Sequence, residues 1–153
     1  MPRPLPLAFA ALVGSAAPCS AQLLVQGIRD LDFGPVIQGI ATSVPPTDPI
    51  RSGQFYFRTP GLGTRIRIQF TLPTRLNGPA GARLPITFGA NDAMARGTAP
   101  ASTPAFFNPN GAVVYQMVTS PDANVWIGGR VTPAANQAVG SYTNTIVITV
   151  TIL

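Results

Sequence analysis

The sequence predicts an all-β fold, a two-sheet antiparallel β-sandwich of about seven strands. Apolar and polar residues alternate over several segments, which is the period of a strand that buries one face. The 153 residues include 17 Pro and 15 Gly, a content typical of many turns between short strands. Lys and Glu, which usually cover the solvent side of a long helix, do not occur. These observations favour strands over helices.

The clearest strand is predicted at residues 64–72. Alternate positions are Ile, Ile, Phe and Leu on one face and Arg, Arg, Gln and Thr on the other, so one face is expected to be buried. Residues 142–152 show the same alternation and are dense in Ile, Val and Thr, the β-branched residues that pleated sheets favour. Both segments are therefore expected to lie against the core.

The remaining strands are expected to be shorter. They are predicted at residues 23–37, with a break near Gly34 and Pro35, and at residues 53–59, 84–88, 112–119 and 124–131. A tight turn at residues 120–123 joins the last two. Residues 38–52 and 91–111 are expected to be loops, and the second is long enough to be functional or mobile.

Residues 1–21 have the pattern of a cleaved secretory signal peptide. A positive residue near the start is followed by an apolar run, and Cys19 and Ala21 are the small residues expected at −3 and −1 from a signal-peptidase site. The run is too short to span a membrane; lipidation of Cys19 is a weaker alternative. We expect residues 22–153 to be one exported domain, in the periplasm, on the outer surface or outside the cell. Cleavage removes the chain's one cysteine, so no disulfide is expected.

The residue types that carry most catalysis are missing. Proton transfer near neutral pH usually uses His, or Glu or Lys with a shifted pKa, and the chain has none of these. A Ser or Thr nucleophile needs an adjacent base, and Asp is the only acidic residue type present. We therefore expect no enzyme activity, no catalytic residue and no cofactor.

Asp30 and Asp32 are the two acidic residues that stand close together in the chain. Two positions apart on a strand, they would face the same way. Such a pair suits Ca²⁺, which takes oxygen ligands, or the two acids of a glycosidase. We favour a pair of solvent-exposed residues, with calcium as the weaker alternative and hydrolysis as the weakest.

Arginines on the exposed face of strand 64–72 form a candidate binding surface. Arg65 and Arg67 could engage an anionic glycan or phosphate, and Tyr56 and Arg58 join them if strand 53–59 pairs alongside. The alternative, which we favour, is that charges on an outer strand prevent edge-to-edge aggregation.

Three aromatic residues are further candidates for ligand binding. Phe106 and Phe107 lie in the Pro-rich segment 91–111, where they either form an exposed patch or pin that segment to the sandwich. Trp126 has apolar neighbours on both sides, so its pattern fits either a core position or an outer platform for a sugar.

Short motifs in the chain resemble those of a bacterial secreted family. They are Leu31-Asp32-Phe33-Gly34, Trp126-Ile127-Gly128-Gly129 and Gly140-Ser141-Tyr142-Thr143-Asn144-Thr145. The family is the domain of unknown function family 4402, which looks related to spore coat protein U-like and fimbrial subunits. The resemblance covers nearly all of residues 22–153. It implies an immunoglobulin-like sandwich, export and a structural role at the cell surface, with no catalytic residue to carry over.

Pilins assembled by a chaperone and an usher offer a second, partial resemblance. They carry a Gly fourteen residues from the C-terminus, then alternating apolar residues and a penultimate aromatic residue. Gly140 stands fourteenth from the end and apolar residues alternate after it, but the penultimate residue is Ile152. The N-terminal extension that such pilins donate to a neighbour's sheet is not evident. We expect a self-complete domain, and donation of its first strand is the alternative.

The sequence thus predicts an exported, non-catalytic structural protein of the cell surface, fimbria-like or coat-like, that associates with itself or with other surface subunits. The alternative is a secreted adhesin or carbohydrate-binding module that uses Trp126, the arginine face or segment 91–111. An anionic glycan is a candidate partner. A nucleic-acid partner and a membrane-spanning segment within residues 22–153 are not expected.

Overall fold

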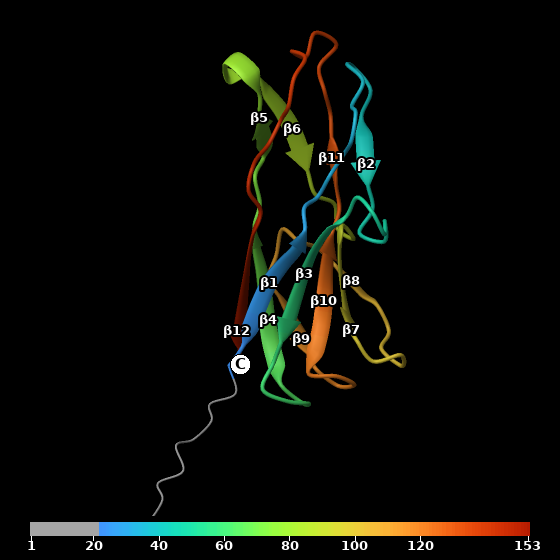
Figure 1. The fold of residues 1–153 in the computed structure, drawn as a ribbon, viewed down its shortest axis with the longest axis vertical. Coiled ribbons are helices and arrows are strands. Elements are labelled where there is room, and N and C mark those ends of the chain that lie inside the picture. Colours follow the sequence, from blue (N-terminus) through green and yellow to red (C-terminus); the bar gives the residue numbers. More distant parts are fainter. Residues whose placement is uncertain (1–21) are drawn as a thin grey trace, which may run out of the picture.

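The computed structural model describes residues 22–153, and the expected leader with Cys19 lies outside this range. Residues 22–153 form twelve short strands and one 3₁₀ turn, Pro79–Gly81 (Figure 1). All strand pairs are antiparallel. The predicted all-β sandwich is confirmed, with more and shorter strands than the seven expected. No helix in this range is long and apolar enough to cross a membrane.

One layer of the sandwich is a five-stranded sheet. In spatial order its strands are β1 (Leu24–Arg29), β3 (Gly53–Arg58), β10 (Asp122–Ile127), β7 (Ala93–Gly97) and β8 (Ala105–Phe107). Alternate residues of β10, which are Ala123, Val125 and Ile127, are 0% exposed. The pleat therefore gives this sheet one buried face and one outer face.

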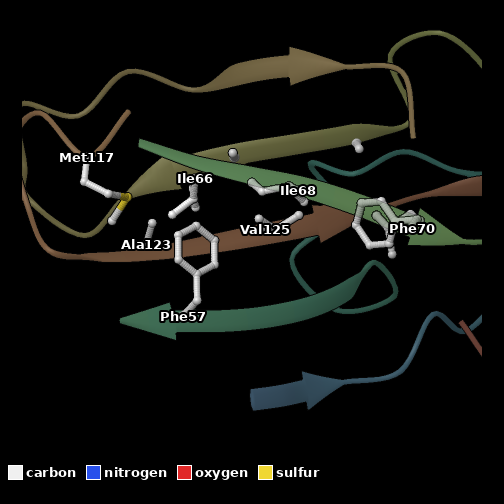
Figure 2. Close-up of a cluster of buried hydrophobic side chains, with 10 residues drawn as sticks. Phe57, Ile66, Ile68, Phe70, Met117, Ala123 and Val125 are labelled. Carbon is white, nitrogen blue, oxygen red and sulfur yellow. The ribbon is translucent and has the colours of Figure 1, made fainter. Parts of the chain in front are cut away.

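The opposite layer has three strands, in the order β12 (Val147–Ile152), β4 (Arg65–Thr71) and β9 (Val113–Gln116). Ile66, Ile68 and Phe70 of β4 are buried, as their alternation predicts. Figure 2 shows them facing Phe57 of β3 and Val125 of β10. Burial of these apolar side chains between the two layers is the main force that holds the sheets together.

A four-stranded sheet forms the other end of the elongated molecule (Figure 1). Its order is β2 (Thr42–Val44), β11 (Gly129–Val131), β6 (Arg83–Thr87) and β5 (Arg75–Asn77). β10 continues into β11 after a break at Gly128. A second apolar cluster lies at this end and contains Phe33, Val44, Leu84, Ile86 and Val131.

Several of the predicted segments differ from the structure. The strand predicted at residues 23–37 ends at Arg29, and residues 38–52, predicted as a loop, contain β2. Residues 91–111, predicted as a loop, contain β7 and β8. The inward residues of β7 begin with Ala93 and Ala95, both 0% exposed; because alanine is small, they give little hydrophobic alternation. The last strand begins at Val147 rather than at residue 142, and the stretch before it is joined to β5 by a single bridge between Thr143 and Asn77.

Candidate functional site

Trp126 lies on the outer face of the five-stranded sheet. Its two neighbours in β10 are 0% exposed and point inward, so the pleat turns Trp126 outward. Its cross-strand partners are Gln54 on β3 and Met94 on β7, and Phe106 on β8 is the partner of Met94. Because cross-strand partners share a face, these four side chains form one row across four strands.

Polar side chains occupy the neighbouring positions of this face. Gln54 Nε2 donates a hydrogen bond to Asn124 Oδ1 over 3.0 Å. Tyr56, the register partner of Asn124, donates its hydroxyl to Asp122 Oδ1 over 2.6 Å. This hydrogen bond is the first cause that raises the pKa of Tyr56 above its ordinary value of 10.0, with burial and the charge of Asp122 contributing further.

Two arginines flank these polar groups. Arg58 Nε lies 3.5 Å from Asp122 Oδ1, and this is the one ion pair that the structure holds within residues 22–153. Arg96, the partner of Asn124 on β7, donates a hydrogen bond from its Nε to the carbonyl oxygen of Ser102 over 3.0 Å.

Trp126 and the other outward residues on this part of the sheet are together named the Trp126 face. They are Gln54, Tyr56, Arg58, Met94, Arg96, Phe106, Asp122, Asn124 and Trp126.

The structure brings only some of the predicted site residues together. Tyr56, Phe106 and Trp126 share the Trp126 face. Phe107 turns the other way and stacks on Phe70 of the opposite layer, with ring centroids 6.4 Å apart. One of the two phenylalanines is therefore exposed, and the other helps to pin β8 to the core.

Arg65 and Arg67 lie on the opposite side of the molecule. They project from the outer face of the three-stranded sheet, in register with Gln116 and Val114 of β9. The condition for grouping them with Tyr56 is not met, because β3 and β4 belong to different sheets. The two candidate surfaces are separate.

Asp30 and Asp32 do not lie on a strand, since β1 ends at Arg29. Asp32 Oδ1 instead accepts a hydrogen bond from the amide of Gly34 over 2.7 Å, which closes a local turn. The premise that the two carboxylates share one strand face was wrong. Residues 22–153 contain no group of three or more His, Cys, Asp or Glu placed to hold a metal ion.

The sandwich is open along one side. β1 is the last strand of the five-stranded sheet and β12 the last strand of the three-stranded sheet, and Figure 1 shows the two strands at the same edge of the molecule. Leu24, Ile28, Val147 and Ile152 on these strands are exposed, at 49%, 50%, 48% and 42%. Within residues 22–153, two strand edges that have no sheet partner and carry exposed apolar side chains thus border this side.

A groove of about 750 Å³ adjoins this open side. One wall is the segment from Gly27 to Gln38 and the other is the segment from Gln137 to Ile146. Its lining includes Ile127 of the apolar cluster between the five-stranded and three-stranded sheets, Phe55 beside that cluster, and Leu84 and Ile86 of the second cluster. The groove therefore connects the two apolar clusters to the surface near the end of β1 and the start of β12.

No protein-family model matches the chain, and no curated protein or solved structure shows significant similarity to it. The resemblance to the fimbria-like family thus stays a prediction that rests on the motifs in the chain.

Sequence reasoning missed the groove, because its walls come from segments about a hundred residues apart in the chain. It also left undecided whether Trp126 faces the core or the solvent, although the sequence contains a pattern that indicates the answer. Asp122 and Asn124 precede Trp126 at intervals of two, so the same alternation that buries Val125 places Trp126 with polar residues on the outer face.

Proposed function

We propose that this protein is an exported, non-catalytic structural subunit of the cell surface, which assembles with other subunits through the open side between β1 and β12. The observation that carries the proposal is the pair of strand edges with exposed apolar side chains at one side of the sandwich, next to the groove of about 750 Å³.

The composition of the two edge strands supports this function. Natural sheets usually protect an edge with charged side chains or Pro, because an unpaired edge is a template for another strand. β12 reads VITVTI and β1 reads LVQGIR, so Arg29 is the single charge on the two strands. Such edges are suited to pairing with a strand of a second subunit.

The groove supports the same mode of association. An extended segment that adds to a sheet edge gains main-chain hydrogen bonds, and pockets for alternate side chains add specificity. Here the edges of β1 and β12 supply the main-chain groups, and Phe55, Leu84 and Ile86 in the lining of the groove supply apolar contacts. A segment of a neighbouring subunit would bury surface that is exposed in the single chain.

Export and the absence of catalysis rest on the sequence. Residues 1–21 have the pattern of a secretory leader. The chain has no His, Glu or Lys to move a proton near neutral pH. A structural subunit does not need residues that move a proton. A subunit of a surface assembly does need to be exported.

The test is the association state of the purified chain together with electron microscopy of the cells that produce it. We expect concentration-dependent oligomers in analytical ultracentrifugation and labelled assemblies on the cell surface. The variant Val147→Lys places a charge on the edge strand β12 and should yield monomers with an unchanged unfolding midpoint. The matched control Val118→Lys changes a residue that is 68% exposed in the segment after β9, and it should associate as the unchanged protein does.

Two results would contradict the proposal. One is a protein that stays monomeric at every concentration reached and never appears in surface assemblies. The other is association that survives Val147→Lys and the further variant Val25→Lys on β1, since both open edges would then be dispensable.

A further inference from the structure

We propose that the Trp126 face binds an acidic polysaccharide, with Trp126 as the platform for a sugar ring and Arg96 as the partner of an acidic group. This site lies on the outer face of the five-stranded sheet, away from the open edges, so it does not rest on the proposed assembly. Trp126 is the one tryptophan of the chain.

The first argument is the position of the indole. The inward places of β10 are filled by Ala123, Val125 and Ile127, so the core of this strand is complete without Trp126. An outward position on a solvated sheet ordinarily carries a polar residue. Trp126 is instead a partly exposed indole, a flat apolar group with a polar N–H at its edge, which suits a partner that has both apolar and polar faces.

The second argument is the extent of the apolar row. Met94 lies between Trp126 and Phe106 in the register and is only 8% exposed, so its side chain is covered by its neighbours. Phe106 is 50% exposed. The row offers two aromatic rings on strands β10 and β8, separated by β7, and thus spans more than one sugar unit. The C–H face of a pyranose ring stacks on such rings.

The third argument is the set of polar groups beside Trp126. The hydrogen bond from Gln54 Nε2 to Asn124 Oδ1 fixes both amides. It leaves Gln54 Oε1 as an acceptor and Asn124 Nδ2 as a donor. Sugar hydroxyls both donate and accept hydrogen bonds, so a fixed donor next to a fixed acceptor matches them.

Charge complementarity selects an acidic glycan. The Trp126 face carries two positive charges, Arg58 and Arg96, and one negative charge, Asp122. Arg58 already forms an ion pair with Asp122. Arg96 uses its Nε for the carbonyl oxygen of Ser102, which holds the guanidinium in place and leaves its terminal nitrogens for a ligand. A carboxylate of a uronic acid can accept two parallel hydrogen bonds from such a group.

The same polar groups disfavour a protein partner on this face. The centre of a protein interface is depleted of charged residues. Here Arg96, Asn124 and Asp122 share the face with Trp126, and a protein would have to pair each of them in a buried setting. A hydrated polysaccharide satisfies them with hydroxyl and carboxylate oxygens.

The experiment measures binding of purified full-length protein to polygalacturonate, with amylose as a neutral polymer for comparison. Because Trp126 is the only tryptophan, its fluorescence reports directly on the proposed platform. We expect polygalacturonate to change the emission, the affinity to fall as salt is added, and amylose to have a much weaker effect.

Three variants distinguish this site from general attraction to a basic protein. Arg96→Gln should weaken binding about tenfold, the size expected for loss of a charge-assisted hydrogen bond. Trp126→Ala, followed by affinity electrophoresis, should abolish it. Arg65→Gln makes the same charge change on the opposite sheet and should leave binding unchanged. Circular dichroism confirms that each variant is folded.

The proposal is overturned if polygalacturonate leaves the emission unchanged, or if Arg65→Gln weakens binding as much as Arg96→Gln. It is also overturned if Trp126→Ala blocks self-association and no polymer binds, because the face would then be a contact between copies. Failure of the edge-strand assembly would leave these results unaffected, since Val147→Lys does not touch this face.

Discussion

The phenolic hydroxyl of Tyr56 on β3 donates a 2.6 Å hydrogen bond to the carboxylate of Asp122 on β10. The two residues belong to neighbouring strands of the same sheet, and the bond joins side chains on its outer face. The carboxylate stabilises the protonated phenol and repels the phenolate, so both effects raise the pKa of Tyr56.

We predict that Asp122→Ala lowers the pKa of Tyr56 towards its ordinary value of 10.0. The hydrogen-bond acceptor and its negative charge are lost together, whereas burial, which raises this pKa, and the weaker opposing charge of Arg58 remain. The measurement is the tyrosinate absorbance titration, taken as the difference between each protein and its Tyr56→Phe counterpart. An unchanged difference titration would show that Asp122 does not act on Tyr56.

The same pair makes stability depend on alkaline pH. Because the folded pKa of Tyr56 lies above the unfolded value of 10.0, its contribution is fully present below pH 10 and is lost as the pH rises through the folded pKa. We predict that the free energy of unfolding falls less steeply above pH 10 in Tyr56→Phe than in the unchanged protein. Equal slopes in chemical denaturation series would contradict this.

Asp48 makes the stability of the fold depend on acidic pH. Its Oδ1 accepts hydrogen bonds from the amides of Arg51, over 2.8 Å, and Ile50, over 2.9 Å, and these lower its pKa below 3.8. The ionised form therefore adds stability above pH 3.8, and this is lost as the pH falls through the folded pKa.

We predict that Asp48→Asn keeps both hydrogen bonds through its amide oxygen and flattens the acid dependence of the free energy of unfolding. Asp48→Ala should flatten it as well and should also lower stability at neutral pH, since the two amides lose their acceptor. Denaturant titrations at a series of pH values distinguish the variants. A full acid slope in Asp48→Asn would assign the slope to other carboxylates.

The strands were predictable wherever large apolar residues alternate with polar ones. Ile66, Ile68 and Phe70 are buried as expected, because in each case a strong local pattern and the tertiary burial agree. β7 escaped the same reasoning because alanines fill its first two inward positions. Its outward residues, Met94 and Arg96, are the longer side chains, so the local pattern points away from the core.

Several residues of the candidate site could be predicted from the sequence, but the surface that they share could not. Tyr56, Phe106 and Trp126 come from three segments, and only strand pairing shows that they share a face. Arg65 and Phe107 belonged to the same predicted set, yet Arg65 projects from the opposite sheet and Phe107 packs inward against Phe70. Which strands pair depends on contacts between distant parts of the chain, and local periodicity carries no information about them.

The packing of β4 predicts the cost of removing one methyl group. Ile68→Val should lower the free energy of unfolding by about 1 kcal/mol, because the side chain is fully buried and the space it leaves is not refilled. Ile50→Val makes the same chemical change at a residue that is 76% exposed, and its effect should stay within about 0.5 kcal/mol. Equal effects of the two changes in denaturant unfolding would place Ile68 outside a packed core.

Gly128, between β10 and β11, allows the chain to pass close to the backbone of residues 44–46. A Cβ at this position would overlap the carbonyl oxygen of Val44 and the backbone nitrogen of Pro46, so neither neighbour can move without shifting β2. We predict that Gly128→Ala destabilises the fold by about 3 kcal/mol, at the upper end of the cost of overpacking. Gly111→Ala is the matched control, because a Cβ there meets nothing within 4 Å, and it should be neutral or stabilising by up to about 1 kcal/mol. If Gly128→Ala unfolds at the same denaturant concentration as Gly111→Ala, β2 does not pack against this break as the structure describes.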